Sequence, residues 1–96
     1  MSETLFWRLF PKKKPIIAMI HVFEGERRQQ IDQALEDLER LQPYVDGVLT
    51  ENYGWGYANA NQATEKTGER LYEITAAVVK HATIPVGVNV LPNDYW

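Results

Sequence analysis

The stretch PIIAMIHV, residues 15–22, decides the fold of this chain of 96 residues. It is an apolar run that is opened by Pro15 and contains a single polar side chain, His21. A continuous apolar run of this length is typical of a strand that is buried on both faces, as strands of parallel sheets are. The sequence therefore predicts a β-strand over residues 16–22 in a parallel sheet.

Four further elements are expected after this strand. They are a helix over Glu24–Leu41 that Pro43 ends, a strand over Val45–Thr50, a helix over Thr67–His81 and a strand over Ile84–Leu91. A long loop over Asn52–Lys66 separates the second strand from the second helix. Each helix has an apolar stripe at spacings of three and four, which indicates one buried face. The stripes are Ile31, Ala34, Leu35, Leu38 and Leu41 in the first helix, and Leu71, Ile74 and Val78, with Ala77 beside them, in the second. The β-α-β-α-β order predicts an α/β fold whose parallel strands are joined by right-handed crossovers.

Composition narrows the classes of function. The net charge of −3 argues against general nucleic-acid binding, which needs a clustered basic surface. The absence of cysteine excludes disulfides and thiolate metal sites, and no apolar stretch approaches the roughly 20 residues that span a bilayer. We expect a cytoplasmic protein. No dinucleotide-binding glycine loop, nucleophile elbow or HExxH motif is present.

The first 14 residues differ in character from residues 15–96, which we expect to form the folded domain. This lead-in joins the apolar segment Leu5–Phe10 to the basic run Lys12–Lys14. Its simplest interpretation is a solvated approach to the first strand. The alternative is a weak anchor that places the protein at the periphery of an anionic membrane.

Polar side chains stand at the end of every predicted strand. They are His21 after the first, Glu51 and Asn52 after the second, and Asn89, Asn93 and Asp94 on or after the third. Because the carboxyl ends of parallel strands share one rim, where ligands of α/β folds bind, these groups predict a small-molecule site. The aromatic residues that follow, Tyr53, Trp55 and Tyr57, are expected to form either a lid over this rim or a packed part of it.

Chemical roles follow from the residue types. His21, Glu51 and Asn89 are the catalytic candidates, with His21 and Glu51 as acid or base. The substrate-binding candidates are Asn52, Tyr53, Trp55, Asn93 and Asp94. No cofactor is identified, although His21, Glu51 and Asp94 could hold a divalent cation. Each residue also has a structural alternative, such as a hydrogen-bonded histidine, a carboxylate paired with arginine, or an asparagine that caps backbone groups.

Three segments of the chain resemble the BtpA/SgcQ family. They are KPIIAMIHV (14–22), VDGVLTENYG (45–54) and IPVGVNVLPND (84–94), in the order that the family has them. The resemblance carries over His21, Glu51, Asn52, Gly54, Asn89, Asn93 and Asp94 as matching positions. It departs at residues 23–26, FEGE, where the family has a loop rich in proline and glycine.

The resemblance implies a (β/α)8 barrel of the ribulose-phosphate-binding type, of which this chain has the first three strands. It implies a role in photosystem I biogenesis at the thylakoid surface, if the host is a cyanobacterium. Alternatively, it implies a barrel enzyme acting on a small polar or phosphorylated sugar-type metabolite. A three-stranded sheet that lacks the rest of a barrel has a bare inner face and free edges. We therefore expect the chain to form homo-oligomers or to belong to a longer chain.

Overall fold

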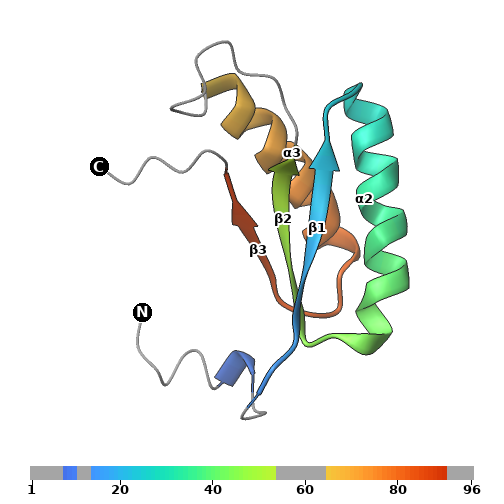
Figure 1. Cartoon of the computed structure of the whole chain (residues 1–96), viewed down its shortest axis with the longest axis vertical. Helices are drawn as coiled ribbons and strands as arrows, with labels where there is room; N and C mark the ends of the chain where they lie inside the picture. The colour runs from blue at the N-terminus through green and yellow to red at the C-terminus, as the bar shows by residue number, and fades with distance from the viewer. Residues whose placement is uncertain (1–7, 11–13, 54–64, 91–96) are drawn as a thin grey trace.

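The computed structural model of the chain describes residues 8–10, 14–53 and 65–90, and has the expected order of elements (Figure 1). The elements are β1 (Ile17–Phe23), α2 (Arg27–Leu41), the 3-10 helix η1 (Gln42–Tyr44), β2 (Gly47–Tyr53), α3 (Glu65–His81) and β3 (Val86–Asn89). The strands form one sheet in the order β1-β2-β3, and both pairs are parallel. The prediction of an α/β fold with a parallel sheet is confirmed.

Both helices pack on one face of the sheet, where the core lies. On the strands the core consists of Ile20, Val22 and Val48, and on the helices of Ala34, Leu38, Leu71, Ile74 and Val78. All of these side chains are at most 2% exposed. The predicted stripe of α3 is therefore confirmed, and the outer members of the α2 stripe, such as Ile31 and Leu35, are partly buried against the same core. Burying each large apolar side chain contributes about 1.5–3 kcal/mol, so this single layer of contacts accounts for the cohesion of the fold.

The first helix begins later than predicted. The chain bends at Glu24 and Gly25, and Glu26 is the extended N-cap residue, so that α2 starts at Arg27 rather than at Glu24. The first turn of α2 therefore contains no acidic residue, and its last turn contains the basic residue Arg40. The second helix begins earlier than predicted, at Glu65 instead of Thr67.

The second strand also has different bounds from the prediction. It runs from Gly47 to Tyr53 because its pairing with β1 continues through Phe23 opposite Tyr53. Consequently Asn52 belongs to a strand rather than to the loop predicted over Asn52–Lys66, and residues 65–66 belong to α3. The remainder of that loop, residues 54–64, lies outside the described residues.

Phe10, in the lead-in, is packed rather than solvated. It is 9% exposed, and its ring lies 3.0 Å from the point that a β-carbon on Gly47 would occupy. A glycine at the start of β2 thus makes room for this ring. Lys14 is exposed as predicted, and residues 1–7 and 11–13 lie outside the described residues. Within the described ranges no helix is long and apolar enough to cross a membrane.

Two buried hydroxyl groups join the sheet to α3. The Thr75 hydroxyl donates to the Leu71 carbonyl at 2.8 Å, so its only proton is engaged there. In the 2.6 Å contact between Thr75 Oγ1 and Thr50 Oγ1, the donor is therefore Thr50. The other possible acceptor of the Thr50 proton, the carbonyl oxygen of Gly87, lies farther away, at 3.4 Å. The short contact with Thr75 thus engages the only proton of the Thr50 hydroxyl.

The direction of the hydrogen bond, from Thr50 to Thr75, predicts that two isosteric substitutions lower stability by unequal amounts. Thr75→Val removes the acceptor of the buried Thr50 hydroxyl and should lower the free energy of unfolding by about 1–3 kcal/mol. Thr50→Val leaves the Thr75 hydroxyl bonded to Leu71 and should cost roughly 0.5–1.5 kcal/mol. Urea unfolding of both variants and of the double variant measures the difference. A larger loss for Thr50→Val would reverse the donor assignment.

The second face of the sheet is uncovered in the described part of the chain. Its apolar side chains remain exposed, at 41% for Ile17, 36% for Met19, 56% for Phe23 and 50% for Tyr53. Val88 is also exposed, at 37%, but it pairs with Thr50 and so lies on the helix-covered face of the edge strand β3. We call the face that carries Ile17, Met19, Phe23 and Tyr53 the open face.

We expect the 96-residue chain on its own to self-associate through this open face, because a contiguous exposed apolar surface is unstable in water. Substituting Ile17→Lys and Met19→Lys together should shift the chain towards monomer in analytical ultracentrifugation. Tyr72→Lys is the matched control, since Tyr72 is 57% exposed on α3. A monomer of 11.1 kDa at all concentrations of the unsubstituted chain would contradict the expectation.

Candidate functional site

His21, Glu51 and Asn89 form one row across the open face. In the register of the sheet His21 is the partner of Glu51, and Glu51 is the partner of Asn89. Paired residues of parallel strands point to the same side of the sheet, so the three side chains come together. The predicted meeting of these residues at one rim is confirmed, and each contributes a different polar group.

The Glu51 carboxylate is the centre of this row. The Asn89 side-chain amide donates to Glu51 Oε2 at 2.7 Å, and His21 Nε2 lies 3.8 Å from Glu51 Oε1. The side chain of Glu51 is 13% exposed and that of His21 is 41% exposed. The hydrogen bond from Asn89 therefore fixes one carboxylate oxygen of Glu51, while the other oxygen faces an imidazole nitrogen at a distance beyond hydrogen-bond length.

Aromatic rings flank the row on the side of the strand ends. Tyr53 stacks on His21 with ring centroids 4.9 Å apart and an interplanar angle of 28°. Phe23 meets both rings edge to face, at 5.4 Å from Tyr53 and 6.4 Å from His21. Tyr53 therefore packs on the site histidine, as the packed-rim alternative predicted, and is half exposed, whereas Trp55 and Tyr57 lie outside the described residues.

The prediction for Asn52 is wrong in its orientation. Asn52 was expected to face the rim beside Glu51, but it lies within β2 and is 2% exposed. Side chains alternate along a strand, so Asn52 points with Thr50 to the helix layer while Glu51 points to the open face. The remaining predicted binding residues, Trp55, Asn93 and Asp94, lie outside the described residues.

The described residues contain no group of three histidine, cysteine, aspartate or glutamate side chains that could hold a metal ion. The suggested ligand set combined His21 and Glu51 with Asp94, which lies outside the described ranges.

A groove of about 410 Å³ lies beside the row, between the end of β1 and α2. It is lined by residues 21–25 of the strand and the following turn, and by Gln29, Gln30, Gln33 and Asp37 of the helix. Sequence reasoning missed this feature because it followed the apolar stripe of α2 and gave no role to the glutamines. Gln30 is in fact 6% exposed.

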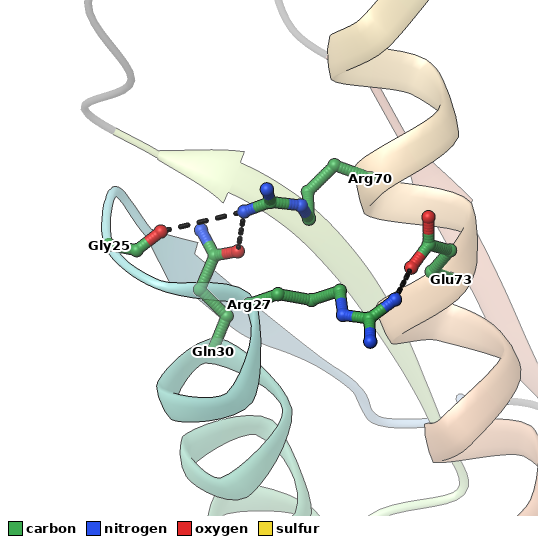
Figure 2. A network of polar contacts seen from close by, with 5 residues as sticks. All are labelled: Gly25, Arg27, Gln30, Arg70 and Glu73. Atoms are coloured by element: carbon green, nitrogen blue, oxygen red, sulfur yellow. Dashed lines mark hydrogen bonds and ion pairs between the residues drawn. The ribbon is translucent and has the colours of Figure 1, made fainter.

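Gln30 is the centre of a polar network at the end of β1, and Figure 2 shows its bond to Arg70, which also donates to the carbonyl oxygen of Gly25. The side-chain amide of Gln30 donates to the carbonyl oxygen of Phe23 at 2.8 Å, and its Oε1 accepts from Arg70 of α3 at 2.9 Å. Nearby, Arg27 at the start of α2 forms an ion pair with Glu73 of α3 at 2.7 Å. The network therefore joins both helices to the strand end that carries His21 and Phe23.

Gln30→Leu should lower the free energy of unfolding by about 1–3 kcal/mol, because it leaves the part-buried carbonyl of Phe23 without its donor and Arg70 without the closer of its two acceptors. Gln33→Leu is the matched control: Gln33 is exposed and bonds only Asp37 on its own helix. We expect the control to change stability by about 0.5 kcal/mol or less. Equal urea midpoints for the two variants would show that the network adds nothing to stability.

Comparison with known proteins places the chain beside three archaeal proteins that are described only as uncharacterized. One from Thermococcus kodakarensis is 30% identical over 92 residues, which cover 86% of this chain and 35% of the relative. Others from Pyrococcus horikoshii and Methanocaldococcus jannaschii are 28% and 27% identical and cover 84% and 86% of this chain. The chain spans about a third of the length of these relatives. No family model matches the chain, and no solved structure matches it.

Proposed function

We propose that this chain supplies the first three strands of a (β/α)8 barrel of the BtpA/SgcQ type, whose rim binds a small polar, sugar-type metabolite. The row His21–Glu51–Asn89 is the observation that carries the proposal. It lies on the sheet face that no described helix covers, which is the inside of such a barrel, and close to the carboxyl ends of the strands, where barrel enzymes bind substrate.

The length of the relatives agrees with a barrel. In the Pyrococcus protein 90 aligned residues make up 34% of the chain, and 90 divided by 0.34 gives about 260 residues. A barrel of this class typically has about 250 residues. In a barrel of eight equal strand–helix units, the first three strands would take up about a third of the length, and this chain spans about a third of the relative.

The row suits chemistry on a hydroxyl group. A ligand hydroxyl placed between Glu51 Oε1 and His21 Nε2 could donate to the carboxylate and accept from the imidazole. Either group could then take or return a proton. Asn89 holds the carboxylate in place, and its bond to Glu51 Oε2 keeps Oε1 directed towards the histidine.

The resemblance to the BtpA/SgcQ family also suggests a second role, in photosystem I biogenesis. This role depends on the resemblance, and the part of the chain that would contact a membrane, residues 1–14, is described only at residues 8–10 and 14. Fractionation of host cells tests it: recovery of the native protein with thylakoid membranes would favour it over the metabolite site.

The metabolite site is tested by NMR titration of the full-length protein with a set of sugars and sugar phosphates. We expect at least one of them to shift the imidazole signals of His21, and His21→Gln and Glu51→Gln to weaken its binding about tenfold or more. His81→Gln is the control, because His81 is exposed in the last turn of α3. Binding that survives both site substitutions would refute the proposed site.

A further inference from the structure

The charge of the open face identifies the chemical class of ligand. None of the three strands contains a lysine or arginine, and Glu51 is their only acidic residue. The arginines of the described helix residues, Arg27, Arg28, Arg40 and Arg70, belong to the layer on the other face of the sheet, where Arg27, Arg40 and Arg70 bond to Glu73, Glu36 and Gln30. The strands therefore bring one negative charge and no permanent positive charge to the open face.

The carboxylate at the centre of the row is mostly buried but incompletely neutralised. Its partners in the described part of the chain are a neutral amide at 2.7 Å and an imidazole at 3.8 Å, which is charged only when protonated. Removing a carboxylate from water without an opposite charge is costly. A cationic group on a ligand would offset this cost, whereas a phosphate group would add repulsion.

The neighbouring rings suit the same kind of group. Tyr53 lies two residues beyond Glu51 on the same face of β2, and it remains half exposed although it stacks on His21. A cation that approaches Glu51 from the strand ends passes the rings of Tyr53 and Phe23. Ammonium groups are attracted to the faces of such rings, by about 0.5–1 kcal/mol at exposed sites.

We infer that this rim binds the protonated amino group of an amine-bearing polyol or sugar, with the ammonium against Glu51 Oε1 and beside the Tyr53 ring. The inference deepens the proposed metabolite site and rests on it. Neighbouring hydroxyl groups of the ligand would then reach His21 and Asn89. A phosphate group, if the ligand has one, would bind away from this row.

The test is a pair of probes that differ in one group. Glucamine carries an ammonium where sorbitol carries a hydroxyl, and their binding to the full-length protein at neutral pH is measured by calorimetry and by the shift of the His21 signals. We expect glucamine to bind about tenfold more tightly than sorbitol, through its charge-assisted contact with Glu51 and its cation–π contact with Tyr53 together. Glu51→Gln keeps an acceptor for Asn89 but removes the charge, so it should remove most of the preference.

The contribution of the ring is tested separately with Tyr53→Leu, which should weaken the binding of glucamine more than the binding of sorbitol. Tyr72→Leu on α3 is the matched control and should change the binding of neither probe. If sorbitol or a sugar phosphate shifts His21 while glucamine binds no better than sorbitol, the inference is overturned and the metabolite site stands. If no probe or sugar binds, both fail.

Discussion

The parallel register of β1 and β2, from Ile17 opposite Gly47 to Phe23 opposite Tyr53, determines which side chains reach each face of the sheet. It places Ile20 beside Thr50 under the helices and His21 beside Glu51 on the open face. Since side chains alternate, a shift of one residue would send His21 into the apolar core and Ile20 to the surface. The core and the candidate site are therefore specified together, because the burial that drives one register also assembles the row.

Cohesion on the helix side changes character along the strands. Near the middle of the sheet it comes from apolar contacts and from the hydroxyl pair of Thr50 and Thr75. Towards the strand ends it comes from Gln30, Arg70 and the Arg27–Glu73 pair, which join the two helices to each other and to Phe23. The strand ends next to the candidate site are thus held on the helix side by hydrogen bonds and an ion pair, while the open face on their other side stays exposed.

The sequence was a good guide to the sheet and a partial guide to the site. Apolar runs and stripes identified all three strands and both helices, and parallel pairing alone predicted that His21, Glu51 and Asn89 would meet. The orientation of Asn52 was missed because composition does not show where strand pairing ends, and β2 continues three residues past Thr50. The burial of Gln30 was missed because periodicity counts apolar side chains, whereas Gln30 is buried by its bonds to Phe23 and Arg70.

The packing of Phe10 against Gly47 has a consequence for how molecules could reach the row. The ring occupies the beginning of β2, near the backbone carbonyl of Pro85, which would lie 3.3 Å from a β-carbon on the same glycine. The chain thus closes the amino end of its middle strand with its own side chain. A molecule that approaches Glu51 along the open face from the amino ends of the strands therefore meets this ring, whereas the carboxyl ends carry the exposed rings of Phe23 and Tyr53.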